Sequence, residues 1–281
     1  MGQYRDRSTL VKMRSHLKTA REAFGDVPAD KITADMFIQW ERSARLRVSD
    51  QSAYSYSKSV RIVFNAAVRR GVILKSPAAL VKNPYPRPGV INPFERMDEV
   101  EAVARELPAV WRALPVFVCT TGLRVEEWAA LERSDIRDNS IYVNKRWTNR
   151  AFKHGTKNGD PERIVPLHPL AAAALDAHPK RIDTKLLFPR PEGDYLNMEY
   201  WARDIWTPAF KAAGVAYRRP KEMRHTFATW SLSGNCNTWT LSKVMGTSVE
   251  NIERTYGRWI PGSESVLFAA MDLFVERSVA K

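Results

Sequence analysis

The sequence predicts a mainly helical protein with a small antiparallel β-sheet, an α+β fold in two domains. Apolar residues recur at helical spacing through the first part of the chain and again after Pro169. Alternating apolar and polar residues, typical of strands, are confined to the middle of the chain. Residues 83–89 contain three alternating prolines and cannot continue a helix. We therefore expect a helical domain over residues 1–84, a linker over 85–91 and a second domain over 92–281.

Three amphipathic helices account for the first domain. Their apolar stripes are Leu10, Met13, Leu17, Ala20 and Phe24; then Met36, Phe37, Trp40 and Ala44; then Val60, Val63, Phe64, Ala67 and Val68. Thr33 is the expected N-cap of the second helix, and Gly71 ends the third.

The second domain begins with helices expected over residues 95–107 and 111–121. Three strands follow, over residues 135–137, 141–143 and 163–167, and form a small meander. Helices return from Pro169 onwards. The last of them, with Ser263 as its cap, has an apolar stripe formed by Val266, Leu267, Ala270, Met271, Phe274 and Val275.

The charge of the chain is concentrated at one end. The net charge is +13, and the first 90 residues hold 17 basic and 7 acidic side chains. Such a concentration favours a polyanionic partner, and nucleic acid more than a membrane surface. A basic protein without such a partner is the alternative.

Several other classes of protein are disfavoured by the composition. No apolar run is long enough to span a membrane, and the first nine residues lack the apolar core of a signal peptide. Cys119 and Cys236 are expected to remain thiols, with Cys119 a buried apolar residue. No Cys–His cluster predicts a zinc site, whereas a magnesium site built from scattered carboxylates stays open.

Four short segments are more informative together than they are singly. In the first, Gly122 breaks an apolar helix, Arg124 opposes the dipole of the next helix, and Glu127 can pair with Arg124. The other three are Thr156-Lys157-Asn158-Gly159; Lys221-Glu222-Met223-Arg224-His225-Thr226-Phe227-Ala228-Thr229; and Val244-Met245-Gly246-Thr247-Ser248-Val249, with Tyr256 nine positions after Thr247. Taken singly, each is explained by an ion pair, a solvated lysine or an ordinary helix start.

Together and in this order, the segments resemble the tyrosine recombinase (phage integrase) family. The family's T-G-L-R-x-x-E box corresponds to residues 121–127, and its hairpin lysine with an R-x-x-P-L strand to Lys157 and residues 163–167. Its H-x-L-R-H-T-F-A-T box corresponds to residues 221–229, and its L-G-H box and tyrosine to residues 245–247 and Tyr256. The first 90 residues resemble the family's core-site DNA-binding domain, so the resemblance covers almost the whole chain.

The resemblance implies that DNA strands are broken and rejoined through a covalent 3′-phosphotyrosine, with Tyr256 as the nucleophile. Arg124 and Arg224 would bind the non-bridging phosphate oxygens, and Lys157 would protonate the leaving 5′-oxygen. Lys221 and Thr247 complete the expected catalytic set. No cofactor and no metal are needed, since the phosphotyrosine stores the bond energy and the cations balance the charge.

Two positions depart from the family pattern. Lys221 stands where histidine is usual, and Thr247 stands where histidine or tryptophan is usual. As an ammonium, Lys221 can donate to phosphate, but it can accept the tyrosine proton only if its pKa is depressed. The proton acceptor is therefore open. Glu127 is expected to orient Arg124 or other site groups, and His225 to have a supporting or structural role.

The expected partner is double-stranded DNA. Lys58, Arg61, Arg69 and Arg70 on the third helix are candidate phosphate contacts, with a solvated face as the alternative. The resemblance implies a C-shaped clamp, four protomers on two duplexes, a monomer or weak oligomer without DNA, and the cytoplasm of a prokaryotic cell. The stripe over residues 266–275 would dock on a neighbouring subunit or pack on its own core.

The predicted function is site-specific recombination, such as integration or excision of a phage or similar mobile element. The alternatives are a type IB topoisomerase, a non-catalytic DNA-binding relative, and a metal-dependent nuclease or transposase. Family members often have a further N-terminal domain that binds arm sites, so we expect an arm-less type or a shortened chain. The DNA target and the direction of the reaction are not predicted.

Overall fold

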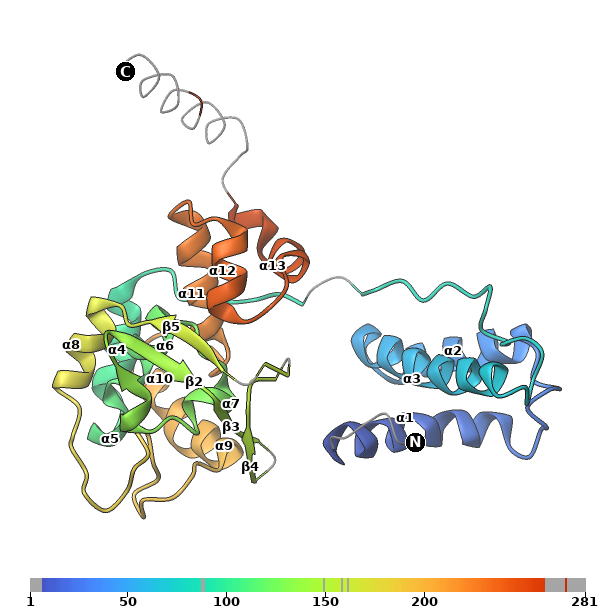
Figure 1. Ribbon diagram of the computed structural model, residues 1–281, viewed down its shortest axis with the longest axis horizontal. Coiled ribbons are helices and arrows are strands. Elements are labelled where there is room, and N and C mark those ends of the chain that lie inside the picture. The colour runs from blue at the N-terminus through green and yellow to red at the C-terminus, as the bar shows by residue number, and fades with distance from the viewer. Residues whose placement is uncertain are drawn as a thin grey trace. The chain divides into compact units, whose positions relative to one another are not determined.

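The computed structural model describes residues 7–86, 89–148, 150–157, 159–160 and 162–260, together with Met271 (Figure 1). The chain divides into two compact units, Met1–Pro88 and Gly89–Lys281. Ile91, which the sequence places in the linker, is buried in the second unit. None of the helices in the described part of the chain is long and apolar enough to cross a membrane.

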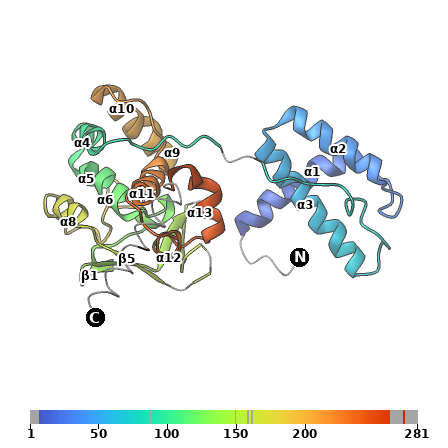
Figure 2. The same ribbon diagram turned by 90° about the horizontal axis from the view of Figure 1, so that it is seen from above.

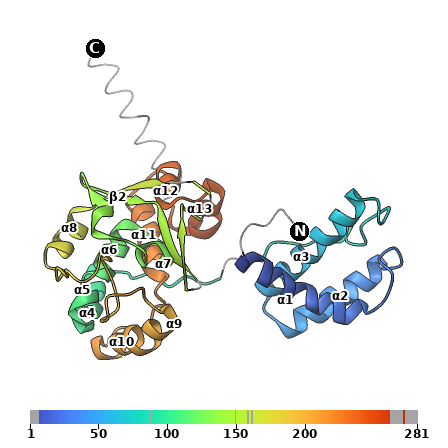
Figure 3. The same ribbon diagram turned by 60° about the horizontal axis from the view of Figure 1, so that its bottom comes forward.

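The first unit is a bundle of three helices (Figure 3). They are α1 (Arg7–Phe24), α2 (Ala34–Arg47) and α3 (Asp50–Arg69). Thr33 caps α2 as expected, since its hydroxyl accepts the N–H of Met36, and Ser49 caps α3 in the same way. The core consists of aromatic and aliphatic residues from the predicted stripes, with Phe37, Trp40 and Phe64 at its centre. Val63 is an exception, because 43% of it is exposed.

The second unit is mostly helical, as predicted. Its helices and helical turns are α4 (Met97–Glu106), α5 (Ala109–Arg112), α6 (Leu114–Thr121), α7 (Val125–Trp128), η1 (Arg133–Asp135), α8 (Pro169–Asp176), α9 (Met198–Trp201), η2 (Ala202–Trp206), α10 (Thr207–Ala213), α11 (Glu222–Ser233), α12 (Thr238–Met245), α13 (Val249–Tyr256) and η3 (Gly257–Trp259). The single helix expected over residues 111–121 is divided into α5 and α6. Pro115 lies in the first turn of α6 and has no N–H to donate to Trp111.

The strands form two small antiparallel sheets. The predicted three-stranded meander is present as β1 (Ile136–Arg137), β2 (Ser140–Val143) and β5 (Arg163–Pro166), in the order β1-β2-β5. A hairpin that the sequence did not predict, β3 (Lys145–Thr148) and β4 (Ala151–His154), is inserted between β2 and β5. No residue of β3 or β4 is fully buried, so the sequence there lacks the alternation that identifies a strand.

Two clusters of buried residues hold the second unit together. The larger one surrounds α6, which packs against α4, α8 and α11 and is filled by large aromatic side chains such as Phe117, Trp128 and Trp206. The smaller one lies among α11, α12 and α13, which are neighbours in Figure 2. Because α11 contacts both α6 and α12, it brings the C-terminal end of α12 and the helix α13 to the turn between α6 and α7.

Candidate active site

The turn between α6 and α7 depends on a glycine. Gly122 ends α6 with a φ of +66°, and a Cβ there would lie 2.3 Å from the ring of Phe227. A larger residue would therefore be both strained and in collision with α11. The turn directs the Gly122 carbonyl to Arg224, whose Nη1 donates to it at 2.6 Å. Arg124 then stands at the N-cap position of α7 rather than inside its first turn.

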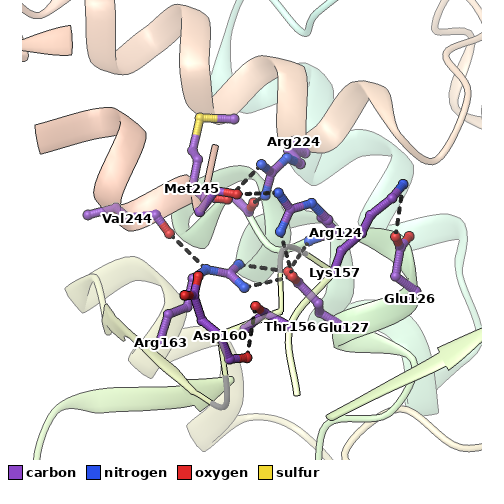
Figure 4. A network of polar contacts seen from close by, with 12 residues as sticks. Arg124, Glu126, Glu127, Thr156, Lys157, Asp160, Arg163, Arg224, Val244 and Met245 are labelled. Carbon is purple, nitrogen blue, oxygen red and sulfur yellow. Dashed lines mark hydrogen bonds and ion pairs between the residues drawn. The ribbon is translucent and has the colours of Figure 1, made fainter. Parts of the chain in front are cut away.

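Glu127 is the centre of the candidate site (Figure 4). Its side chain is 1% exposed and pairs with two arginines. One carboxylate oxygen accepts Nη1 of Arg124 at 2.8 Å and the other accepts the backbone N–H of Arg124 at 2.8 Å. Arg163 donates to both oxygens, at 2.6 and 2.7 Å. Glu127 thus orients Arg124 and a second arginine at once.

The charge state of Glu127 follows from these partners. Burial acts to raise its pKa, but the hydrogen bonds and charge of Arg163, with the charges of Arg124 and Arg224, outweigh burial and lower the pKa to about 2. Glu127 is therefore ionised at neutral pH and compensates part of the positive charge around it.

Three consecutive carbonyls at the C-terminal end of α12 hold the same arginines. Arg163 Nε donates to Val244 O at 3.1 Å, Arg224 Nη2 donates to Met245 O at 2.8 Å, and Arg124 Nη2 donates to Gly246 O. The last carbonyls of a helix lack partners within the helix and carry the negative end of its dipole. The α12 terminus therefore positions three guanidiniums. We call Arg124, Arg163 and Arg224, with Glu127, the arginine cluster.

Gly246 allows this close approach. It has a φ of +60°, and a Cβ at this position would lie 2.9 Å from Cδ of Arg163. Arg224 remains a cation in the cluster. Burial and the charge of Arg124 lower its pKa to about 10, while Glu127 acts in the opposite direction, so the guanidinium stays protonated at neutral pH.

Tyr256 is the last residue of α13 and is only 4% exposed. Its hydroxyl oxygen lies 2.7 Å from Nδ1 of His225. Burial raises the pKa of Tyr256 to about 12, although Arg224 is near enough to lower it. Burial lowers the pKa of His225 to about 4; the charge of Glu222 acts to raise it, and the charge of Lys221 acts to lower it. Both rings are therefore neutral at neutral pH.

The two candidate lysines differ from the arginines in their surroundings. Lys157 follows β4, on a turn closed by a hydrogen bond from the N–H of Thr156 to Asp160 O at 2.8 Å. Its side chain is 63% exposed, and its Nζ lies 3.7 Å from Glu126 of α7. Lys221 is exposed at the N-cap of α11, and its side chain makes no hydrogen bond or ion pair with the described residues.

Thr247 directly follows the arginine-holding carbonyls of α12. Its hydroxyl accepts Nδ2 of Asn251 at 2.9 Å, and Asn251 in turn accepts Arg254 Nη2 at 2.7 Å. The threonine that replaces the usual histidine is thus fixed by α13.

Sequence reasoning did not name Arg163 as a site residue. It appeared only as the first residue of the R-x-x-P-L strand, yet its side chain is 9% exposed and is the main partner of Glu127. A signal was present in the sequence, since an arginine opens a short apolar strand immediately after the segment that contains Lys157.

The predicted DNA contacts on α3 fall into two groups. Lys58, Arg69 and Arg70 are exposed. Arg61 differs from them, because its guanidinium donates to Ser57 Oγ at 2.9 Å and to Ala78 O at 2.7 Å, and its side chain is 17% exposed. It also pairs with Glu41 at 3.5 Å, so it ties α3 to its neighbours within the unit instead of presenting a free cation.

The remaining predictions concern the C-terminal stripe, the two cysteines and a possible metal site. Ser263 and the stripe over residues 266–275 lie outside the described residues, apart from Met271, which is exposed. Cys119 is buried and Cys236 is half-buried, and both are free thiols. Within the described ranges, no three His, Cys, Asp or Glu side chains gather closely enough to hold a metal ion.

The sequence of the second unit and the fold of the chain correspond to a known class of proteins, the phage integrases. The model of the phage integrase family matches residues 95–258, and the chain belongs to this family.

Its relatives include curated bacterial recombinases. The chain is 28% identical over 216 residues to tyrosine recombinase XerC of Myxococcus xanthus, covering 70% of this chain and 68% of that protein. It is 22% identical over 212 residues to tyrosine recombinase XerD of Listeria monocytogenes, with the same coverage of 70% and 68%.

Solved integrase structures share the fold. The Tn1549 transposon integrase in complex with transposon right end DNA aligns with a TM-score of 0.79 at 16% identity, over 98% of this chain and 95% of that one. A lambda integrase tetramer bound to a Holliday junction aligns with a TM-score of 0.68 at 17% identity, over 88% and 73%.

Proposed function

We propose that the protein is a site-specific DNA recombinase that cleaves and rejoins DNA through a covalent 3′-phosphotyrosine at Tyr256. The main observation is the arginine cluster. It holds Arg124 and Arg224 on the α6–α7 turn and the end of α12, with Arg224 close enough to Tyr256 to lower the pKa of the phenol. Membership of the phage integrase family supports the same activity.

The two arginines are suited to a phosphate because only part of their donor capacity is used. Each guanidinium has five N–H groups. Arg224 donates two of them to Gly122 and Met245, and Arg124 donates two to Glu127 and Gly246. The remaining N–H groups can donate to the non-bridging oxygens, where negative charge increases in the transition state.

In the cleavage step, the phenol oxygen of Tyr256 forms a bond to phosphorus and passes its proton to a base in the site, while the bond from phosphorus to the 5′-oxygen breaks. Lys157 gives a proton to that oxygen as it leaves. The phosphotyrosine keeps the energy of the broken bond, so the reverse reaction reseals DNA without an external energy source. Lys157 must first leave Glu126, an exposed ion pair that costs little to break.

Double-stranded DNA is the proposed partner. The net charge of +13, with its excess in the first 90 residues, supports a large phosphate-binding surface. Exchange of strands between two duplexes needs four cleavages, so we propose four protomers on two duplexes and a monomer or weak oligomer without DNA. The structure of a lambda integrase tetramer bound to a Holliday junction, which shares the fold, supports an assembly of four.

A duplex nicked close to the cleavage point tests the proposal. The target site is first located in the sequence that flanks the gene. Loss of the short fragment beyond the nick prevents resealing, so the protein–DNA adduct accumulates. The native chain should form this adduct, whereas Tyr256→Phe should bind the duplex with unchanged affinity and form none. An adduct that persists in Tyr256→Phe would rule out this nucleophile.

A type IB topoisomerase and a non-catalytic relative are separated by two further results. A topoisomerase would relax supercoiled DNA that lacks the target and yield no recombinants, whereas a non-catalytic relative would form no adduct at all. A metal-dependent nuclease would lose activity in chelator, and the proposed chemistry should not.

A further inference from the structure

The surroundings of Tyr256 identify one basic group within reach of its hydroxyl. In the part of the chain that the structure describes, the phenol oxygen makes a single hydrogen bond, to Nδ1 of His225 at 2.7 Å. The ring centroids are 5.6 Å apart. Because Tyr256 is only 4% exposed, bulk water has little access to the hydroxyl.

The two positions that usually bear histidine do not supply such a group. The side chain of Lys221 makes no hydrogen bond with any described residue, and as an ammonium it has no lone pair to accept a proton. The hydroxyl of Thr247 already accepts an N–H from Asn251, and a threonine hydroxyl is far too weak a base to take a phenol proton. The proton acceptor must therefore come from another position.

We propose that His225 is the catalytic base that accepts the proton of Tyr256. This inference rests on the proposed function. In the required tautomer the ring proton is on Nε2, and the Tyr256 hydroxyl donates to Nδ1. As the bond from the phenol oxygen to phosphorus forms, the O–H bond breaks and the proton moves to Nδ1. When the 5′-hydroxyl later attacks, the Tyr256 oxygen leaves and takes the proton back from His225.

Without DNA, burial and the charges around His225 keep its ring in the neutral form that can accept a proton. Lys221, Arg224 and Arg219 all disfavour the imidazolium, so together with burial they keep the ring neutral and able to accept. Glu222 acts in the opposite direction. Its buried carboxylate is fixed by the N–H of Asn92 at 3.0 Å and by Arg219 at 3.2 Å, and it lies one turn before His225 on α11. It can therefore compensate the imidazolium once the proton has moved.

The DNA phosphate makes protonation of His225 more favourable. Its negative charge enters beside Arg124 and Arg224 and offsets the cations that oppose protonation of His225. Proton transfer is then concerted with attack on phosphorus, so that a free phenolate never accumulates.

The direct test replaces the base while keeping a hydrogen-bond acceptor. In His225→Asn, the amide oxygen can accept from the Tyr256 hydroxyl but cannot take its proton. We expect adduct formation on the nicked duplex to slow by about 10²-fold or more, the range that general base catalysis contributes. The matched control, His154→Asn, changes an exposed histidine on β4 and should retain the native rate. A native rate in His225→Asn would overturn the proposal.

Two chemical substitutions separate a base from a structural residue. A 5′-bridging phosphorothiolate has a leaving group that needs no proton, so it should restore cleavage by Lys157→Ala but not by His225→Asn. A fluorinated, more acidic tyrosine at position 256 should accelerate His225→Asn more than it accelerates the native chain. Recovery of His225→Asn by the phosphorothiolate, or equal acceleration of both chains by the fluorinated tyrosine, would overturn the role of His225.

The same experiments distinguish failure of the proposed function from failure of the role of His225. Tyr256→Phe should give no adduct in every arm. If it does give one, the nucleophile is wrong and the proposed function fails. If the native chain and His225→Asn form the adduct at equal rates and Tyr256→Phe forms none, the recombinase proposal stands and only the role of His225 is lost.

Discussion

The arginine cluster and Lys157 lie in the same unit but are held in opposite ways. Each of Arg124, Arg163 and Arg224 bonds to backbone carbonyls of α12, and Glu127 is buried among them. Lys157 is 63% exposed on a turn, and among the described residues it has one ion pair, with Glu126 at 3.7 Å. Charge stabilisation works best when donors are fixed before the reaction. A proton donor must instead reach a leaving oxygen that only the DNA brings into place.

The largest expected effect on cleavage comes from changing an arginine of the arginine cluster. Arg224→Lys keeps the positive charge but loses the planar guanidinium that bridges Gly122 and Met245 and that we propose to bind a phosphate oxygen. Single-turnover cleavage of the nicked duplex should slow by about 10²–10³-fold. Arg203→Lys is the matched control and should cleave normally, because Arg203 is exposed and pairs with its neighbour Asp204. Normal cleavage by Arg224→Lys would show that no bidentate contact is made.

Removing the charge of Glu127 should affect folding as well as cleavage. Glu127→Gln places an amide against two arginines and leaves their buried charge uncompensated. We expect the free energy of unfolding to fall by about 3 kcal/mol, as for other broken buried pairs. Glu126→Gln on the same turn is the control, because its side chain is 24% exposed and pairs only with Lys157 among the described residues. Denaturant titration measures both, and equal stability of the two variants would contradict the buried role of Glu127.

The same carboxylate makes stability depend on pH. Its pKa falls from 4.5 to about 2 on folding, so the ionised form stabilises the fold at neutral pH by about 3 kcal/mol. This contribution is fully present above pH 4.5 and is lost as the pH falls towards 2. Between these values the native chain should lose more stability than Glu127→Gln does. Parallel pH profiles for the two chains would contradict the lowered pKa.

Lys157→Ala tests the exposed lysine, which the structure holds by an ion pair rather than by backbone carbonyls. Cleavage should slow by about 10²-fold, since general acid catalysis is lost. The stability of the chain should change by less than about 0.5 kcal/mol, as for an exposed surface residue. Thermal unfolding and single-turnover cleavage separate the two effects. A large loss of stability would mean that Lys157 is a structural residue.

The smallest effects are expected on α3, where the same contrast recurs. Arg69→Ala and Arg70→Ala remove exposed cations, and each should reduce the slope of log affinity against log salt by about 1. Arg61→Ala should leave that slope unchanged and instead lower the free energy of unfolding by about 1–3 kcal/mol, because the Ala78 carbonyl and Glu41 lose a partner. The reverse pattern would restore Arg61 as a phosphate contact.

The sequence predicted the parts of the molecule that depend on local pattern. The stripes of α1–α3 and the strands β1, β2 and β5 were recognisable because burial on one face leaves a period in the sequence, and Thr33 was recognisable as the cap of α2. The hairpin β3–β4 was missed because neither face is fully buried. Arg124, Arg224 and Tyr256 were predicted as site residues from the family motifs alone.

Contacts between distant segments were not predictable in the same way. Arg61 and Arg69 look alike in the sequence, and only the packing of Ala78 and Glu41 against α3 makes one structural. The roles of Arg163 and His225 likewise depend on α12 and α13, which approach β5 and α11 only in the folded chain.

The most direct test of the account is to identify the residue that becomes bound to DNA. The native chain is incubated with the nicked duplex, the adduct is digested with protease and nuclease, and the modified peptide is sequenced by mass spectrometry. We predict a single nucleotide-bearing peptide, modified at Tyr256 through its phenol oxygen. A modification at another residue, or no covalent adduct with a duplex that the protein binds at its target site, would contradict it.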